Sequence, residues 1–354
     1  MAQPSVPKKF LVIDTDAGVD DAVAISIALK MCAETGFELP LITTSFGNVD
    51  VEQVTTNVCK TIEKCGHAAT TVGEGVGGPL KGGCRLDATY FHGEDGLGNH
   101  TKRTGDDGAS ARSRLANGSA SERFLELCRK VVSSPIGCEL VLVTLGPLTN
   151  LASFLATDRL LCLSAVSKLY IMGGCSNGRG NCTRTGEFNI CADPEAADTV
   201  FGESLWRSIS VVPWELCVTH PIPWAVFDAC VSSQHVTDLG AFIRDICHAP
   251  YVANREREVA DPSLNPGMPS GKRSATGAVI CDALCIVVAL DFESVVADQC
   301  LVHVAVELNG TLTRGTTVVD FGHSYDLEPR DRTVRWITAV NTDVYANAFK
   351  RLFQ

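Results

Sequence analysis

The chain has 354 residues, of which 45% are hydrophobic and 20% charged, a balance typical of a globular protein with a large core. Its formal net charge of −11 argues against nucleic acid or an anionic membrane as the main partner, because phosphate groups are bound by basic patches. The N-terminus lacks the apolar region of a signal peptide, and the apolar run ALCIVVAL is far too short to span a bilayer.

Sixteen cysteines are scattered along the chain without a Cys-x-x-Cys pair or a zinc-ligand spacing. Together with the missing signal peptide, this pattern favours a reduced, cytoplasmic enzyme with buried free thiols. The Asn-x-Ser/Thr sites at Asn117, Asn181 and Asn309 are then chance matches and not glycosylation sites.

Short β-branched runs alternate with longer stretches of helical periodicity. The expected strands cover Lys9–Ile13, Leu41–Thr44, Thr70–Gly73, Leu140–Thr144, Lys168–Met172 and Ile209–Val212. The expected helices cover Asp20–Cys32, Val51–Lys64, Ala120–Val132, Leu148–Ala156 and Pro194–Phe201. Uniformly apolar strands that alternate with helices indicate an α/β fold, in which helices cover both faces of a mostly parallel central sheet. No shift in composition divides the chain, so we expect a single domain over residues 1–354.

Two polar segments interrupt this alternation, at residues 74–119 and 248–273. Both are longer than ordinary connections, and segments of this length are either functional lids or partly disordered. We expect them to lie over the active site and to close over a bound substrate.

Four aspartates, Asp14, Asp16, Asp20 and Asp21, follow the apolar run FLVI within eight positions. Capping of a helix, worth about 1 kcal/mol, is one explanation for Asp20 and Asp21. It does not cover the other two, and carboxylates about 4 Å apart repel by roughly 4 kcal/mol at an effective dielectric near 20. Either some are protonated or a cation lies among them, and all-oxygen ligands suit Ca²⁺ or Mg²⁺. We therefore predict a metal site where strand carboxyl ends meet.

The stretch DTDAGVDDAVA resembles the N-terminal signature of the inosine–uridine-type nucleoside hydrolase family. Also similar to that family, and in its order, are TTSFGNVDVEQVTTN, VGEGVGGPL, FHGEDGLG, TLGPLTNLA, YIMGG, GNCTRTGEFNICADPEAA and CDAL. The resemblance covers nearly the whole chain and implies a Rossmann-like fold with the active site at the C-terminal ends of the strands. It also implies hydrolysis of ribonucleosides to ribose and free base for purine salvage, by a homodimer or homotetramer.

The resemblance implies one Ca²⁺ at the bottom of the pocket. Its ligands would be the side chains of Asp16, Asp21 and Asp282 and the backbone carbonyl of Leu145. Asp16 would also be the general base that takes a proton from the attacking water. Asp14 would orient its neighbours without touching the ion.

The same resemblance implies a set of residues around the ribose. They are Asp20, Asn48, Met172, Asn181, Glu187, Phe188 and Asn189. Carboxylates and amides supply acceptors and donors for sugar hydroxyls, and carboxylates stabilise a positively charged transition state of the ring. Turn formation is the alternative for Asn181, Glu187 and Asn189, and core packing is the alternative for Met172 and Phe188.

The residue before Asp282 is Cys281, where many family members have a His that protonates the departing base. A thiol with a pKa of about 8.5 is a weak donor. Because purines can instead be activated by protonation at N7, the missing His favours purine nucleosides, with inosine and guanosine first. The long segments offer further candidate donors to the base: Tyr90, His92, His248, Tyr251 and Arg255. Solvent exposure is the alternative for these residues, and apolar packing is the alternative for Cys281.

Three alternatives to a purine nucleosidase remain open. The first is a nucleosidase that acts on both purine and pyrimidine nucleosides. The second is a nucleoside-binding protein that keeps the fold and the calcium site without turnover. The third, a metal-dependent glycosyltransferase or phosphatase, would need a phosphate cradle, and the sequence has neither a Walker-type motif nor a cluster of basic residues.

Overall fold

The computed structural model describes residues 7–67, 69–82, 85–233, 237–253, 255–256, 277–322 and 333–354. Within these residues, ten strands form one sheet. In spatial order they are β11 (Thr317–Asp320), β10 (Val296–Val306), β12 (Val334–Val340), β7 (Ile209–Val212), β6 (Lys168–Met172), β5 (Cys138–Thr144), β1 (Lys8–Thr15), β2 (Phe37–Thr44), β3 (Thr71–Glu74) and β4 (Ala116–Ser119). Neighbours from β12 to β4 are parallel, whereas β10 is antiparallel to both β11 and β12.

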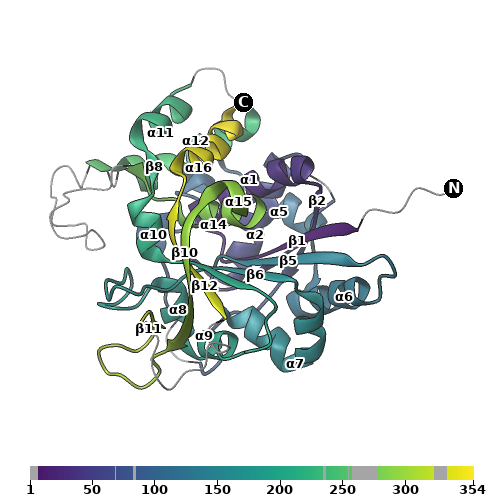
Figure 1. Cartoon of the computed structure of the whole chain (residues 1–354). Helices are drawn as coiled ribbons and strands as arrows, with labels where there is room; N and C mark the ends of the chain where they lie inside the picture. Colours follow the sequence, from purple (N-terminus) through teal and green to yellow (C-terminus); the bar gives the residue numbers. More distant parts are fainter. Residues whose placement is uncertain are drawn as a thin grey trace.

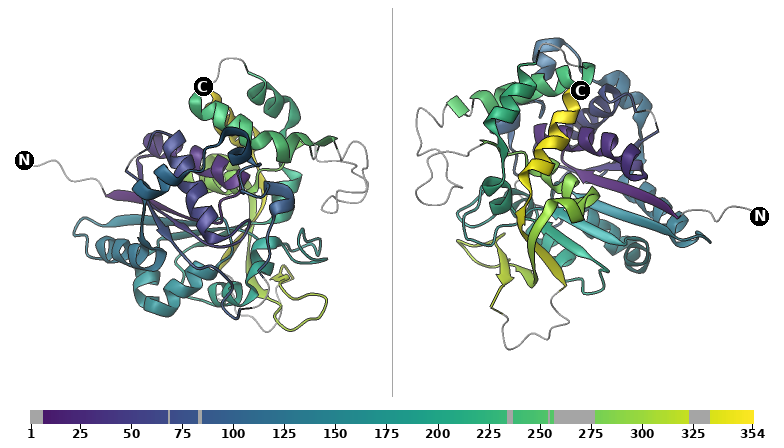
Figure 2. Two further views of the ribbon diagram at one scale, coloured as in Figure 1. Left: turned by 180° about the vertical axis from the view of Figure 1, so that it is seen from behind. Right: turned by 45° about the horizontal axis from the view of Figure 1, so that its top comes forward.

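Helices cover both faces of this sheet, and the two further views agree on the three layers (Figures 1 and 2). One face carries α1 (Val19–Thr35), α2 (Val51–Lys64), α12 (Asp238–Cys247), α14 (Cys281–Leu290), α15 (Phe292–Val295) and α16 (Thr342–Lys350). The other carries α6 (Ala120–Val132), α7 (Thr149–Ala165) and α9 (Pro194–Phe201). The predicted α/β fold with a mostly parallel sheet is therefore confirmed.

Burial of both faces of the sheet explains why the central strands are apolar without interruption. Along β1, Leu11 and Ile13 pack into the core that contains α1 and α14, whereas Phe10 and Val12 pack into the core that contains α6 and α7. The helix α1 is buried along most of its length and ends at Gly36, whose positive φ of 75° suits glycine. The chain thus fixes β1 and α1 firmly, and the aspartate cluster runs from Asp14 at the end of β1 through Asp16 in the turn to Asp20 and Asp21 in the first turn of α1.

All predicted strands and helices are found, in several cases with longer bounds: the helix expected over Asp20–Cys32 covers Val19–Thr35. The helix expected over Leu148–Ala156 is interrupted close to its expected end, because α7 is kinked at Asp158 and a second helical segment follows to Ala165. Residues 74–119, expected to be a polar loop, instead contain β4 and α3 (Thr89–His92), α4 (His100–Thr104) and α5 (Ala109–Leu115). Glycine-rich turns between these short helices hide their periodicity. The second long segment begins with the π-helical turn η1 (His248–Ala253), and its residues 254 and 257–273 lie outside the described residues.

Smaller elements complete the fold. They are α8 (Phe188–Ala192), α10 (Trp214–Thr219), α11 (Trp224–Val231), the antiparallel pair β8 (Ile222–Pro223) and β9 (Gly277–Ala278), and the final 3-10 turn η4 (Arg351–Phe353). Of these, α8 and α10 follow the central strands β6 and β7, so they bring further side chains to the carboxyl edge of the sheet. Among the described residues, every helix is too short or too polar to cross a bilayer.

Candidate active site

A cavity of about 220 Å³ lies at the carboxyl ends of β1, β2, β5 and β6. Predicted site residues that line it are Asp16, Asp20, Asn48, Tyr90, His92, Leu145, Met172, Asn181, Glu187, Phe188, Asn189, Cys281 and Asp282. Lining residues that were not predicted are Ala88, Phe91, Trp214, Val218 and Val279. The fold therefore gathers side chains from ends of the chain that are far apart in sequence into one cavity.

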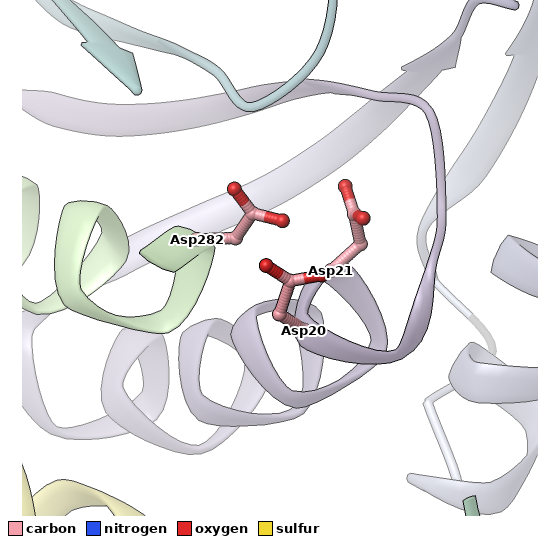
Figure 3. A group of neighbouring side chains, drawn as sticks. All are labelled: Asp20, Asp21 and Asp282. Carbon is pink, nitrogen blue, oxygen red and sulfur yellow. The ribbon is translucent and has the colours of Figure 1, made fainter. Parts of the chain in front are cut away.

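Two helices begin at the floor of this cavity. Asp20 and Asp21 lie in the first turn of α1, and Asp282 lies in the first turn of α14; Figure 3 shows the three carboxylates pointing toward one another. One oxygen from each lies within 4.8 Å of the others. Both helix N-termini carry partial positive charge, which offsets part of the repulsion between these carboxylates.

Hydrogen bonds fix the neighbouring carboxylates of the floor. The Oδ2 atom of Asp16 accepts the Asn48 backbone N–H at 2.9 Å. The Asp21 Oδ2 atom accepts the Gly18 backbone N–H at 2.7 Å and the Asn48 side-chain amide at 3.2 Å, and the Thr15 hydroxyl donates to Asp21 Oδ1. Since these donors come from the backbone or from buried side chains, the carboxylates are held in place before any ligand binds.

Glycines let the backbone pass close to Asp16 on two sides. A Cβ atom at Gly47 would lie 1.9 Å from Asp16 Oδ2, and one at Gly146 would lie 2.9 Å from Asp16 Cγ. Any larger residue at either position would displace the Asp16 carboxylate. The glycines of SFGN and LGPLTN therefore shape the floor around this side chain.

The floor carries more negative charge than its own hydrogen bonds compensate. Burial raises the pKa of Asp20 and of Asp21 to about 6, and burial with the neighbouring carboxylates holds the pKa of Asp16 and of Asp282 well above the usual range. Among the described residues, buried Asp20 Oδ1 has no hydrogen-bond partner. A hard divalent cation prefers this all-oxygen donor set, so the buried triad is consistent with a metal site.

The triad differs in one member from the predicted ligand set. It contains Asp20, which was expected to bind ribose, whereas Asp16 lies beside it and raises the pKa of Asp282 by its charge. The carbonyl of Leu145 lines the cavity and accepts the Asn189 side-chain amide at 2.7 Å. The ligand roles of Asp16 and Leu145 stay predictions.

Asp14 lies behind the floor, outside the cavity lining. Its Oδ1 atom accepts the Thr43 hydroxyl at 2.5 Å and the Asn150 side-chain amide at 2.7 Å. Burial raises the pKa of Asp14 to about 7. The Asn150 amide also donates to the Thr44 carbonyl at 2.9 Å, so this network ties the ends of β1 and β2 together.

On the ribose side of the predicted site, residues that line the cavity also stabilise the local backbone. Glu187 caps α8, because its Oε1 atom accepts the Asn189 N–H at 2.9 Å and its Oε2 atom accepts the Ile190 N–H at 3.3 Å. The Oε2 atom also accepts the Gly174 N–H at 2.9 Å, which ties α8 to the end of β6. Asn181 Oδ1 accepts the Phe188 N–H at 2.8 Å. Burial raises the pKa of Glu187 to about 7. The side chains of Glu187 and Asn181 thus both stabilise the local backbone and line the cavity.

His92 lies against the start of α1. Its Nδ1 atom accepts the Val19 backbone N–H at 3.0 Å, and its Nε2 atom lies 3.9 Å from Asp20 Oδ1. Burial lowers the pKa of His92 to about 4. The ring is therefore neutral at pH 7, and because Nδ1 accepts a hydrogen bond, its proton is on Nε2. Such a ring is a poor proton donor to a departing base.

The remaining wall of the cavity is mostly apolar, with Trp214 and Val218 from α10, and Val279 and Cys281 next to them at the start of α14. The neighbouring Cys217 thiol and burial hold the pKa of the Cys281 thiol well above its usual range. A neutral thiol of this kind does not protonate a leaving group at pH 7.

Three predicted donors do not line the cavity. His248 is exposed, and Arg255 pairs with Asp228 at 2.8 Å on the outer side of α11. Tyr251 is buried and its ring packs edge-on against Phe91, with 5.7 Å between ring centroids. Tyr90 does line the cavity, and its 75% exposed side chain lies at the rim.

The unpredicted wall residues carry weak sequence signals. Phe91 begins the stretch FHGEDGLG and directly precedes His92, which was singled out. Trp214 begins the helix that follows the parallel strand β7, so its position at a strand carboxyl end was the signal that could have identified it.

The fold and the site define an α/β protein with a carboxylate-rich, metal-compatible cavity at the carboxyl edge of its sheet. Residues 11–347 match the family model described as inosine-uridine preferring nucleoside hydrolase. The chain is 33% identical over 310 residues to the non-specific ribonucleoside hydrolase RihC of Salmonella agona, which covers 88% of this chain and 87% of that protein. The chain belongs to the inosine-uridine preferring nucleoside hydrolase family.

Other relatives differ in their named substrates. Uridine nucleosidase 1 of Arabidopsis thaliana is 38% identical over 191 residues, which is 54% of this chain and 52% of that protein, so the chain spans about half the length of this plant relative. The solved structure of an inosine-guanosine nucleoside hydrolase matches with a TM-score of 0.79 and 26% identity over 98% of each chain. Family membership is therefore firm, whereas the relatives do not agree on one base.

Proposed function

We propose that this chain is a calcium-dependent nucleoside hydrolase, which cleaves the N-glycosidic bond of ribonucleosides to give ribose and free base. The observation that carries the proposal is the meeting of Asp20, Asp21 and Asp282 next to a cavity that Asp16, Asp20 and Asp282 line, in a member of this family. The whole chain would act as one nucleoside hydrolase domain, in the cytoplasm, as a homodimer or homotetramer.

Calcium would be held by Asp16, Asp21, Asp282 and the carbonyl of Leu145, with Asp20 adjacent. When bound, the cation neutralises part of the carboxylate charge and polarises the attacking water. Asp16 is the base that accepts the proton of that water, because one of its oxygens is fixed by the Asn48 N–H and the side chain faces the cavity.

The remaining polar groups bind and stabilise the sugar. Asn48, Asn181 and Asn189 bind its hydroxyls, and Met172 and Phe188 pack against the ring. As the bond to the base breaks, positive charge develops on the sugar, and the carboxylates of Asp20 and Glu187 stabilise that charge electrostatically. The short helix that carries Tyr90 and His92 would close over the bound substrate.

We further propose a preference for inosine and guanosine. The wall around Trp214 and Cys281 is apolar, and the thiol there has a raised pKa, so this wall supplies no acid and the departing base must be one that can take its proton from solvent. Purines allow this through protonation at N7, whereas pyrimidines lack that position. The similarity to RihC, which is named non-specific, favours a broad-specificity nucleosidase as the second candidate.

Release of reducing sugar from inosine, guanosine, adenosine and uridine tests both levels of the proposal. We expect ribose and free base without any need for phosphate, and kcat/KM values for inosine and guanosine about tenfold above that for uridine. No ribose from any nucleoside would overturn the hydrolase. Equal kcat/KM values for inosine and uridine would overturn the purine preference and support the broad-specificity enzyme.

A further inference from the structure

A hydroxyl from the C-terminal part of the chain holds the backbone that follows β6. Thr317, the first residue of β11, is only 3% exposed. Its Oγ1 atom accepts the Cys175 N–H at 2.8 Å and donates to the Cys175 carbonyl at 2.9 Å. Three strands, β10, β12 and β7, separate β11 from β6 in the sheet, so this contact is not strand pairing. One side chain thus satisfies both backbone polar groups of Cys175.

The residue before Cys175 connects this contact to the cavity on two sides. The Gly174 N–H donates to Glu187 Oε2 at 2.9 Å, and the Gly174 carbonyl accepts the Trp214 backbone N–H at 2.9 Å. Both Glu187 and Trp214 line the cavity. Gly174 therefore holds one charged and one apolar part of the site, and Thr317 holds the residue next to it.

Close packing accompanies these hydrogen bonds. Gly174 has a φ of 82°, and a Cβ atom there would lie 3.0 Å from Thr317 Cγ2 and 3.2 Å from its Oγ1, so only glycine lets the two segments approach in this way. The residue before Thr317 makes a further contact, because the hydroxyls of Thr316 and Thr185 are hydrogen-bonded to each other. The turn that leads into β11 therefore packs against the segment 173–187, close to α8 (Figure 1).

We propose that Thr317 is a positioning residue for the hydrolysis of the nucleoside, and that it acts through the backbone of Gly174 and Cys175 on the Glu187 carboxylate. This inference rests on the proposed function, in which that carboxylate stabilises the positive charge on the sugar. Glu187 accepts three backbone N–H groups, and two of them belong to its own helix α8. The third, from Gly174, ties the carboxylate to the end of β6, and Thr317 fixes the backbone that carries this donor.

Loss of the Thr317 hydroxyl should act on the chemical step more than on binding. Cys175 is only 1% exposed, so without this hydroxyl its N–H and carbonyl are buried without a partner, and the backbone moves to regain hydrogen bonds. The Gly174 N–H then moves relative to the Glu187 carboxylate. A catalytic group that is displaced by about 1 Å can lose about a hundredfold in rate. Because the charge on the sugar develops only in the transition state, kcat falls while KM changes little.

Steady-state kinetics of the full chain with calcium test the role of Thr317. Thr317→Val keeps the shape of the side chain without the hydroxyl, and we expect kcat for inosine to fall about tenfold or more, with KM within about threefold of the native value. Thr317→Ser keeps the hydroxyl and should keep kcat within about twofold. If the valine variant does not fold, Thr317→Ala gives the same comparison.

Thr70→Val is the matched control for the loss of a buried hydroxyl. Thr70 is fully buried and donates to the Leu39 carbonyl at 2.7 Å, and it lies outside the cavity lining. This variant should lower the melting temperature about as much as Thr317→Val does, and it should keep the kcat of the native enzyme. A fall in kcat only in Thr317→Val therefore separates positioning from a general loss of stability.

Hydrogen exchange measures the positioning without reference to activity. We expect the amides of Gly174 and Cys175 to exchange faster in Thr317→Val than in the native chain or in Thr70→Val. Unchanged exchange at these amides, an unchanged kcat in Thr317→Val, or an equal fall of kcat in Thr317→Ser would overturn the proposal. If the native chain released no ribose from any nucleoside, the proposed function would fail, and hydrogen exchange would still decide whether Thr317 holds this segment.

Discussion

The floor of the cavity and its apolar wall are built in opposite ways. On the floor, Asp16 and Asp21 are buried and held by N–H and O–H donors from β1, the α1 turn and Asn48. In the wall, Trp214 and Val218 contribute apolar surface, and the neighbouring Cys217 thiol and burial raise the pKa of the Cys281 thiol, so this thiol stays neutral. The floor thus holds negative charge where it stabilises the transition state. The wall makes packing contacts with the base, and these contacts stabilise the bound substrate and the transition state equally.

The largest effect should follow from removal of one charge on the floor. Asp16→Asn keeps the size of the side chain but abolishes its ability to accept a proton, so we expect kcat for inosine to fall about a thousandfold. The affinity for a ribose-like inhibitor should change much less, because the sugar contacts remain. Steady-state kinetics at saturating calcium and calorimetric titration of the inhibitor measure the two quantities.

A matched control is Asp50→Asn, the same substitution at an exposed position. Asp50 caps α2 by accepting the Gln53 N–H at 2.9 Å, and asparagine caps helices equally well. This variant should keep the kcat of the native enzyme. If Asp16→Asn kept more than about a tenth of that kcat, Asp16 would not be the base.

The contrast between floor and wall also explains which parts were predictable. The floor comes from short contiguous motifs: DTDAGVDD supplies Asp16, Asp20 and Asp21, and CDAL supplies Asp282. A local cluster of like charges after an apolar strand predicts a cation site without any knowledge of tertiary contacts. The order of strands and helices was predictable for the same reason, since uninterrupted apolar runs record burial on both faces.

The wall was less predictable because its residues are apolar and separated. Trp214, Val218 and Val279 look like core residues until α10 and β9 are brought together by the fold. His92 is a second example. The sequence suggests that this histidine is an acid near the site, whereas its contact with the Val19 N–H and the burial that lowers its pKa disfavour that role. Such roles depend on tertiary contacts.

A smaller effect, of a different kind, should follow from changes in the wall. Trp214→Ala removes an aromatic surface from the cavity, and stacking of a base on an aromatic ring is worth about 1–3 kcal/mol, so KM for inosine should increase about tenfold. The kcat should stay within about threefold of the native value, because the floor is unchanged. Steady-state kinetics separate the two parameters.

Trp224→Ala is the matched control for the wall. Trp224 packs edge-on against Phe227 with 5.7 Å between ring centroids and lies beneath Arg255, outside the cavity lining. Its removal should lower the melting temperature without changing KM. A large loss of kcat in Trp214→Ala would show that the wall takes part in bond breaking, which would end the distinction between the two regions.

The smallest effect concerns the stability of the floor as pH changes. Burial raises the pKa of Asp20 and of Asp21 from 3.8 to about 6, so the folded chain binds these protons more tightly than the unfolded chain does. Their contribution to stability is fully present below pH 3.8 and is lost as pH rises through about 6. His92 acts in the opposite direction, since its pKa is lowered from 6.5 to about 4, but it is one group against several carboxylates.

The effect of calcium on the melting temperature reports on these carboxylates and not on other titrating groups, because the ion competes with protons for the same oxygens. The increase in melting temperature on adding calcium should therefore be near zero at pH 4.5 and a few degrees at pH 7.5, where a concentration of about 100 times Kd stabilises by about 2.7 kcal/mol. Differential scanning calorimetry with chelator and with calcium measures this difference. In Asp282→Asn the increase at pH 7.5 should shrink, since the triad has lost one charge. A calcium effect independent of pH would mean that the ion binds somewhere other than this floor.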